Sequence, residues 1–485
     1  MDGLKGISGL NGIGEAPALT ARPDKLAMPV RALLWLGGFL LALAICFPLS
    51  ASAGVHNDFS QNVWLPARLL FSGVDPYNPT RQQVGAALGQ YSLDFAAFNS
   101  GRNFHFIYPL WLAVALSPFA ALPLVTANAI WRALNLVLLF WAIGALLRSW
   151  NPAFRLLRAP VIGAIAVAAV LGSGILDAVR IMPGYRESFL TLYLGQFSII
   201  ELGLLAGVWS WLISSAQREP RARLWGDALT GVALAVLATK PQAVGLPVIL
   251  LGLWTISRRR FVIPGAALAS LAALLVVPNV FYSWSLGSWL GVAFGNGQAG
   301  SQASVSASVW GLSYQWLGPS APWVAVAVIL SLVGLVALLP RWWGDLRDRT
   351  SPVPLALPLT LCMNSVISPY MLGYEHVLLL MPALLYLAMA GVPGAQADAG
   401  QARSTLKWNF GIYTWMAILP LLVVGMQATI DKEYPAIVQS LPMLALCWLV
   451  RLNLLTGSGL HAGSGQFTRS GFTELGPTEL GWKKQ

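Results

Sequence analysis

Two charged residues, Asp58 and Lys240, lie beside or within long apolar runs of this chain, where charged residues are rare. Asp58 follows the first long apolar run, near the start of a polar segment over residues 54–104. Lys240 precedes Pro241 in the middle of another apolar stretch, 227–256. A carboxylate at a membrane surface can act as a general base, and an ammonium at the centre of a membrane helix costs about 2.5–3.5 kcal/mol and needs a reason to stay there. The two residues together predict chemistry at one face of a bilayer.

Each of these candidates also has a simpler explanation. Aspartate is a favoured N-cap, so Asp58 could serve only to cap the helix that follows it. Lys240 could snorkel, with its apolar stem along a short hairpin and its ammonium in water. Residue type alone leaves both explanations open.

Further polar residues lie in or beside apolar runs. Arg180 and Arg186 precede Gln196 in a short loop, where their guanidinium groups either bind a phosphate or are simply solvated. Gln196 is expected inside an apolar helix, and a buried amide there bonds another helix or a ligand. Glu201, which follows on the same run, is expected to form a structural pair.

A last polar pair, Glu375 and His376, lies just beyond Pro369 in an apolar run. The histidine either orients a phosphate or a sugar, or is structural at a helix end. No Asp-x-Asp or His-x-x-x-His spacing appears in the chain, so no metal site is expected. We expect no other cofactor.

The elements that position these residues must be membrane helices. The 485 residues are 56% hydrophobic and only 10% charged, which excludes an ordinary soluble protein. The chain is predicted to be an all-α, polytopic integral membrane protein with about 12 crossings. The apolar runs are 32–53, 106–122, 124–147, 159–176, 189–214, 227–256, 262–282, 320–340, 353–368, 369–391, 408–429 and 436–455.

The net charge of +11 has an explanation in topology. Most basic residues fall in short connectors between apolar runs, as in cytoplasmic loops. Segment 54–104 balances its charges and segment 283–318 has none, so these two are the predicted outward loops. Nucleic acid is therefore not needed as a partner.

The outward loop 283–318 combines Ser, Gly and Gln with four tryptophans. This composition suits carbohydrate binding by hydroxyl contacts and ring stacking, or equally an aromatic belt at the membrane interface. The tryptophans are Trp284, Trp289, Trp310 and Trp316.

One membrane domain, 29–457, is expected between two tails. Residues 1–28 and 458–485 are rich in Gly, Ser, Thr and Pro and are predicted to be disordered and cytoplasmic. Residues 106–122 are interrupted by prolines and are expected to form a re-entrant or partly embedded hairpin. The alternative is that the basic connector 148–158 lies outside.

Local signals organise the first outward loop. Apolar residues from Phe59 to Phe71 recur at helical spacing, so an amphipathic interfacial helix is expected there, kinked at Pro66 and stopped at Gly73. Thr80 is expected to cap a second short helix at about 81–90. Outside this loop, the chain's three cysteines all lie in apolar runs and are expected to be core residues rather than disulfides or ligands.

The order of these short motifs is more specific than any one of them. The series resembles the polyprenol-phosphate-dependent glycosyltransferases of the GT-C superfamily and is most similar to glycosyltransferase family 87, the α-mannosyltransferase-like group. The resemblance covers about 58–382. The motifs are Asp58-Phe59, Ala67-Arg68-Leu69-Leu70-Phe71-Ser72-Gly73, Asp75-Pro76-Tyr77, Phe106-Ile107-Tyr108-Pro109, Pro118, Leu122-Pro123, Gly195-Gln196, Lys240-Pro241, Ser368-Pro369-Tyr370 and Tyr374-Glu375-His376.

The resemblance implies a GT-C-like bundle that moves one sugar, a mannose-like hexose, from a polyprenyl-phosphate donor to a lipid or glycan acceptor. It implies inverting transfer on the extracytoplasmic face of the bacterial plasma (inner) membrane, facing the periplasm, with Asp58 as the catalytic base. Lys240, Arg180 and Arg186 are then the candidates for the donor phosphate. The candidate substrate-binding residues are Tyr77, Tyr108, Gln196, Glu375 and His376.

Two other classes of function share this composition. A transporter or flippase for lipid-linked sugars would also be apolar with buried polar residues, but transporters commonly show inverted repeats, and none relates the two halves here. A polysaccharide polymerase or ligase would usually carry several arginines in a large late outward loop, whereas 283–318 is uncharged. A glycosyltransferase is the reading the sequence favours.

Overall fold

A computed structural model describes residues 28–53, 58–88, 106–150, 195–295, 306, 308–318, 322–349, 351–371, 373–382, 384 and 385. Within these residues all regular structure is helical, which confirms the predicted all-α class. The helices are α1 (Met28–Ala53), η1 (Ser60–Trp64), α2 (Leu65–Phe71), α3 (Arg81–Leu88), α5 (Leu110–Ala115), α6 (Ser117–Ala120), α7 (Leu124–Trp150), α10 (Ser198–Ser214), η4 (Ser215–Gln217), α11 (Pro220–Leu237), α12 (Pro241–Ser257), α13 (Val262–Phe281), α14 (Ser285–Gly295), α16 (Val309–Leu317), α17 (Pro322–Arg347), α18 (Leu357–Ile367) and η5 (Gly373–Leu379).

Three of the described helices are long and apolar enough to cross a membrane, in α7, α13 and α17. Four shorter apolar segments lie in α1, α10, α12 and α18. The expected count of about 12 crossings is therefore not confirmed. The apolar runs 159–176, 408–429 and 436–455 fall outside the described residues.

The helices pack around a core on which α7, α10, α11, α12, α17 and α18 all converge. Among the closest pairs are α11 with α13, α1 with α7, α7 with α10, and α12 with α18. The outer faces of α1, α13 and α17 carry many exposed apolar side chains. Such surfaces suit contact with lipid tails, which are as apolar as the side chains themselves.

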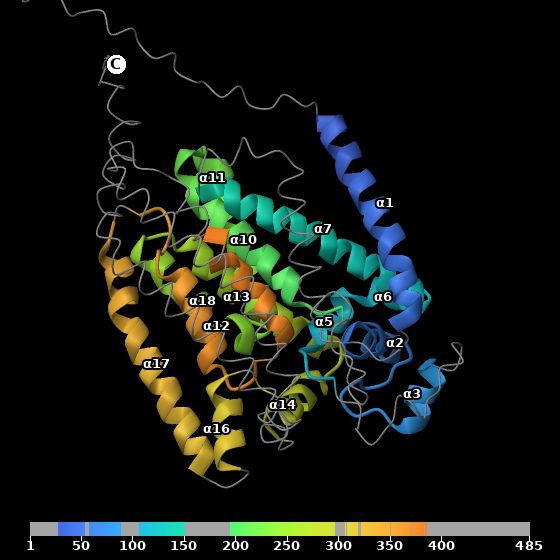
Figure 1. The fold of residues 1–485 in the computed structure, drawn as a ribbon. Helices are drawn as coiled ribbons and strands as arrows, with labels where there is room; N and C mark the ends of the chain where they lie inside the picture. Colours follow the sequence, from blue (N-terminus) through green and yellow to red (C-terminus); the bar gives the residue numbers. More distant parts are fainter. Residues whose placement is uncertain are drawn as a thin grey trace, which may run out of the picture.

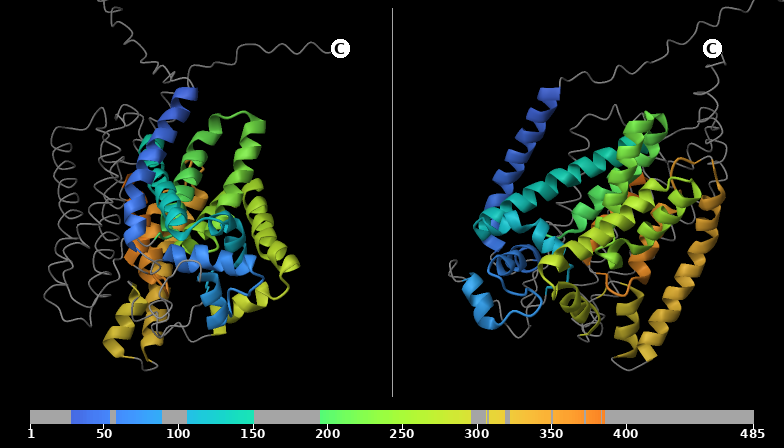
Figure 2. Two further views of the ribbon diagram at one scale, coloured as in Figure 1. Left: turned by 90° about the vertical axis from the view of Figure 1, so that its right-hand side faces the viewer. Right: turned by 180° about the vertical axis from the view of Figure 1, so that it is seen from behind.

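The described parts of the two predicted outward loops lie at one end of the bundle. Figures 1 and 2 show α2, α3, α14 and α16 at the lower end, whereas the start of α1 and the α10–α11 connection lie at the upper end. The loops also contact each other, since Ser288 Oγ donates a hydrogen bond of 3.2 Å to Asp75 Oδ2. Trp289 Nε1 of the second loop donates one of 3.2 Å to the Ile107 carbonyl, just beyond the first loop. Which side of the membrane this end faces stays a prediction.

The first loop folds largely as its sequence indicates. The expected amphipathic helix is a π-helical turn, η1, continued by α2, and the change of helix type falls just before Pro66. Phe59 and Val63 are buried, whereas Phe71 at the end of α2 is 65% exposed. Gly73 follows with φ +71°, a left-handed conformation that ends the helix. Thr80 caps α3 as expected: its Oγ1 accepts from the Gln83 amide at 3.3 Å, and Gln83 Oε1 accepts from the Thr80 amide at 2.8 Å.

Residues 106–122 do not form one spanning helix. They contain α5 and α6, of six and four residues, and a six-residue helix is only about 9 Å long. Neither helix can cross a hydrocarbon core of about 30 Å. This geometry agrees with a partly embedded segment.

The described cysteines behave as core residues. Cys46 and Cys362 are free thiols and both are buried, as predicted. Cys447 lies outside the described residues.

Candidate active site

A buried ion pair joins two segments far apart in the sequence. Lys240 Nζ lies 2.8 Å from Glu375 Oε1, and the two side chains are 2% and 0% exposed. The same ammonium donates a hydrogen bond of 3.3 Å to Ser198 Oγ at the start of α10. Because the ammonium is buried, the explanation that Lys240 snorkels to water is wrong.

Proline creates both helix breaks that bring this pair together. A residue before proline is disfavoured in the α conformation. Lys240 accordingly has φ −123° and ψ 67° between α11 and α12, and Ser368 has φ −63° and ψ 134° at the end of α18. Since α12 packs against α18, the break at Lys240 and the segment that carries Glu375 meet.

Asp58 reaches the same region from the first loop. The side chain after it, Phe59, is fully buried against Trp131, with ring centroids 5.5 Å apart. Trp131 Nε1 in turn donates a 2.7 Å hydrogen bond to the Gly195 carbonyl. Gly195 has φ +68°, and a Cβ there would lie 2.7 Å from the Phe59 Cβ. Only glycine therefore lets the Asp58 turn approach α7 and the start of α10 this closely.

The start of α10 carries two buried polar groups that lack partners in the described structure. Gln196 is 2% exposed and precedes α10, so its expected position inside a helix is wrong. Its Nε2 has no hydrogen-bond partner among the described residues. Glu201 is fully buried in the first turn of α10, and within the same part of the chain neither carboxyl oxygen is hydrogen-bonded. The structural pair expected for Glu201 is absent there.

The buried Tyr108 phenol is affected by the charges of both Asp58 and the buried ion pair. Burial raises the pKa of its phenol to about 12, so the hydroxyl stays protonated near neutral pH. Four charged groups also act on the phenol, first Lys240, which lowers its pKa, and then Asp58, Glu201 and Glu375, which raise it. The loop aspartate and the buried ion pair are therefore both within electrostatic reach of one hydroxyl.

The Tyr370 phenol is affected by two of the same charges. Burial raises the pKa of this phenol, and the charges of Glu375 and Asp58 raise it further. The Ser368-Pro369-Tyr370 motif was visible in the sequence, but nothing in its spacing marked the tyrosine as a site residue. Its neighbourhood adds it to the candidate site.

Tyr77 supports this arrangement through the backbone. Its side chain is fully buried, and its hydroxyl donates a 2.8 Å hydrogen bond to the Tyr108 carbonyl. Its ring lies 5.3 Å from that of Phe106. Tyr77 thus positions Tyr108, and direct contact of Tyr77 with substrate stays a prediction.

Three candidates cannot be placed by their side chains. Arg180 and Arg186 lie outside the described residues. His376 follows Glu375 in η5, and its side chain is outside the described part of the structure. Their proposed contacts with phosphate or sugar stay predictions.

The tryptophans of the second loop have different roles. Trp289 and Trp310 use their indole N–H groups to bond the carbonyls of Ile107 and Ile367, so they brace the backbone on both sides of the site. Trp316 is 67% exposed and suits the alternative of an interfacial aromatic. Among the described residues, no group of three or more His, Cys, Asp or Glu side chains could hold a metal ion.

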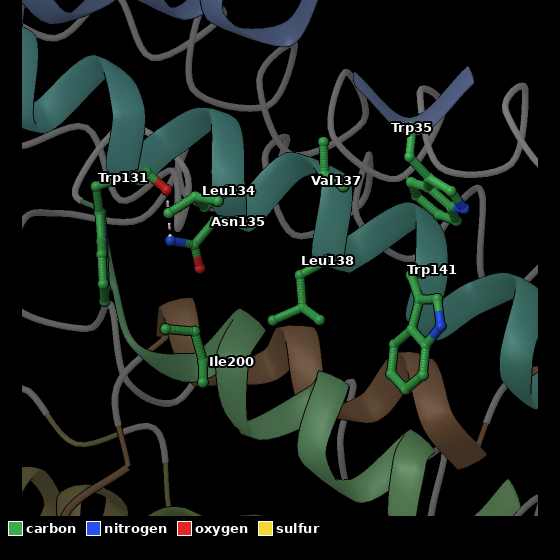
Figure 3. A pocket seen from close by; sticks show the side chains of 8 residues that line it. All are labelled: Trp35, Trp131, Leu134, Asn135, Val137, Leu138, Trp141 and Ile200. Carbon is green, nitrogen blue, oxygen red and sulfur yellow. Dashed lines mark hydrogen bonds between the residues drawn. The ribbon is translucent and has the colours of Figure 1, made fainter. Parts of the chain in front are cut away.

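An apolar cavity lies beside the Asp58 end of the site. It has a volume of about 480 Å³ between α1, α7 and α10, and its lining includes Trp35, Trp131, Trp141 and Ile200. Figure 3 shows these side chains and the hydrogen bond of 2.8 Å from Asn135 Nδ2 to the Trp131 carbonyl. The cavity begins at Trp131, the residue against which Phe59 packs.

Apolar helices that surround a buried polar site are typical of an integral membrane protein with an embedded site. The family model of glycosyltransferase family 87 matches residues 106–369, more than half of the chain. The chain therefore belongs to glycosyltransferase family 87, and the protein is a membrane glycosyltransferase. No curated protein and no solved structure matches it. The match includes Tyr108, Gln196 and Lys240, whereas Asp58 and Glu375 lie beyond its limits.

Proposed function

We propose that the enzyme transfers one mannose-like hexose from a polyprenyl-phosphate donor to a lipid or glycan acceptor, with inversion at the anomeric carbon. The reaction is placed at the extracytoplasmic face of a bacterial plasma membrane. One observation carries the proposal: Phe59, next to Asp58, packs on Trp131, which bonds Gly195, and three residues later Ser198 accepts from Lys240, so a base and a cation from distant segments meet at the start of α10. Glycosyl transfer from a phosphate needs these two kinds of group near one sugar.

In the proposed reaction Asp58 serves the acceptor. An acceptor hydroxyl is a weak nucleophile, and the carboxylate takes its proton while its oxygen bonds the anomeric carbon. The bond from that carbon to the phosphate oxygen breaks on the opposite face, and its electron pair leaves with the polyprenyl phosphate. A positioned general base contributes about 10²–10⁴ to such a rate.

Lys240 serves the leaving group. The phosphate gains negative charge as the bond breaks, and a preorganised cation stabilises charge that develops in the transition state. Glu375 and Ser198 hold the ammonium in place, so little reorganisation is needed when the phosphate arrives. Removal of Glu375 would leave the Lys240 ammonium without a counter-charge in an apolar interior. The carboxylate is therefore needed, even though it competes with the phosphate for the lysine.

The remaining groups suit the sugar and the lipid chain. Gln196 offers a buried donor, its Nε2, and Glu201 two buried acceptors, and none of these three atoms has a hydrogen-bond partner among the described residues. Buried polar groups are normally hydrogen-bonded, and sugar hydroxyls would supply partners of both kinds. The apolar cavity beside Trp131 is suited to an isoprenoid chain, because its lining in α1, α7 and α10 carries no charge.

The test is transfer by the purified full-length protein in liposomes. The substrates are radiolabelled polyprenyl-phosphate mannose and a bacterial lipid extract, and the control is the same protein with Asp58→Asn. We expect the label to move from the donor to a glycolipid as polyprenyl phosphate is released, and the control to transfer at least about 10²-fold more slowly. Label taken only from a nucleotide sugar would contradict the proposed donor. Movement of the intact donor across the bilayer without transfer would favour the transporter alternative.

A further inference from the structure

The helix that begins at Lys240 is broken in its first turns. Val244 in α12 has φ −138° and ψ 15°, outside the helical range, and Pro247 follows three residues later. In a regular helix the Leu246 amide would bond the Gln242 carbonyl, and the amide of residue 247 would bond the Ala243 carbonyl. Proline has no N–H, so the second of these bonds cannot form.

One side chain from another helix bonds the groups that the break leaves. Asn364 Oδ1 on α18 accepts from the Leu246 amide at 3.1 Å. Its Nδ2 donates to the Gln242 carbonyl at 2.9 Å and to the Ala243 carbonyl at 2.7 Å. Asn364 is 4% exposed, so its amide supplies, without water, both a donor and an acceptor where the helix cannot.

The turn that Asn364 holds is the turn that starts at Lys240. The Ala243 amide donates to the Lys240 carbonyl at 3.0 Å, which links the lysine directly to the bonded carbonyls. Asn364 lies in the last turn of α18, which ends at Ile367. Beyond that end the chain turns toward Glu375. The asparagine therefore joins the two segments that carry the two members of the buried ion pair.

We infer that Asn364 is a positioning residue: it fixes the Lys240 ammonium where the donor phosphate binds. The inference rests on the proposed role of Lys240 in phosphate binding. Asn364 touches neither reacting group, and it acts by holding the first turn of α12 in a broken but fully bonded form. An apolar side chain of the same size would pack but would leave two carbonyls and one amide without these partners.

A small displacement of a positioned group is costly in an active site. A shift of about 1 Å can lower a rate by ~10²-fold. We expect Asn364→Leu to weaken binding of polyprenyl phosphate and to lower kcat by about 10-fold to 100-fold. A purely structural asparagine would change the unfolding temperature without changing the affinity of the folded fraction.

Thr360, one turn earlier on α18, provides a matched control. It is fully buried, and its Oγ1 accepts a 2.9 Å hydrogen bond from Trp342 Nε1 of α17. Thr360→Val removes that bond with little change of volume and lies away from Lys240 along the helix. It should lower stability and leave donor affinity within about twofold of wild type, because its bond holds α17 rather than the start of α12.

The experiment measures the dissociation constant of a fluorescent polyprenyl phosphate for detergent-purified full-length protein. The variants are Asn364→Leu, Thr360→Val, Lys240→Met and Lys240→Met with Asn364→Leu. We expect Asn364→Leu to weaken binding in the wild-type background and to have no further effect once Lys240 is Met. If Asn364→Leu does not fold, Asn364→Asp replaces it, since it keeps the volume and the acceptor for Leu246 and loses both donors.

The outcomes separate this inference from the proposed function. Unchanged binding in both Asn364 variants, together with weakened binding in Lys240→Met, would overturn the positioning role alone. Equal weakening by the Asn364 change with and without Lys240 would also overturn it, because the effect would then not pass through the lysine. Unchanged binding in Lys240→Met would instead overturn the proposed phosphate role of Lys240.

Discussion

Separate replacement of Lys240 and Glu375 should destabilise the protein more than replacement of both. The two side chains are almost fully buried and their charged atoms are 2.8 Å apart. Removal of one member of a buried pair leaves the other charge uncompensated and costs about 3–5 kcal/mol. Replacement of both members by apolar residues of similar size is often close to neutral. We therefore expect Lys240→Met and Glu375→Leu each to lose about 3–5 kcal/mol, and the double variant to lose less than either.

Sugar transfer should not follow this recovery of stability. The double variant restores the balance of charge but has no cation for the departing phosphate, so it should be as inactive as Lys240→Met. Lys240→Arg keeps the charge and should retain part of the activity. The assay is a double-mutant cycle of unfolding midpoints in detergent, measured beside the rate of transfer from polyprenyl-phosphate mannose. Near wild-type transfer by the double variant would refute the catalytic reasoning, and strictly additive losses of stability would refute the ion pair.

Three further results are expected. Gly195→Ala forces a side chain into a left-handed conformation at about 1–2 kcal/mol and against the Phe59 Cβ; it should lower both the unfolding midpoint and transfer, and an unchanged rate would separate Asp58 from this contact. The pKa of Tyr108 is raised from its usual 10 to about 12, so its contribution to stability is present below pH 10 and lost toward pH 12. Because this phenol ionises little between pH 9 and 11, the rise in absorbance at 295 nm over that range should be the same in wild type and Tyr108→Phe. In a chain with no other cysteine, a membrane-impermeant thiol reagent should label Ser72→Cys and not Arg259→Cys in intact cells, because both positions are exposed and basic connectors stay inside.

The sequence indicated which helix breaks matter but not what they bring together. Proline after Lys240 marked a break between two apolar runs, and the structure has α11 and α12 on either side of it. The partner of Lys240 was not predictable, because Glu375 follows a separate break and reaches the lysine only when α12 packs on α18. Glu375 was therefore assigned to substrate alone.

The wrong prediction that Gln196 lies inside a helix has a local cause. The apolar run 189–214 reads as one continuous helix, so Gln196 was expected inside it. Gly195 adopts a positive φ instead, and the helix begins at Ser198. Composition cannot show this conformation, because it depends on the approach of Phe59 and Trp131 from other segments.

Asn364 shows the limit of reading polar residues one at a time. It lies in the apolar run 353–368, where a single amide gave no reason for attention. Its proposed role depends on its three hydrogen bonds to the backbone of α12, where Val244 and Pro247 interrupt the helix. Such a match between one side chain and a distant backbone is a property of the packed structure.

The most direct test of the account is the turnover of Asp58→Asn. The amide keeps the shape and the capping ability of the carboxylate but cannot accept the proton of the acceptor. The control is Asp348→Asn, which makes the same chemical change just after the last residue of α17. We predict a well-folded Asp58→Asn protein that still binds polyprenyl phosphate and transfers sugar at least about 10²-fold more slowly than wild type, with the control unchanged. Near wild-type turnover by Asp58→Asn would reduce the residue to a helix cap and contradict the proposed base.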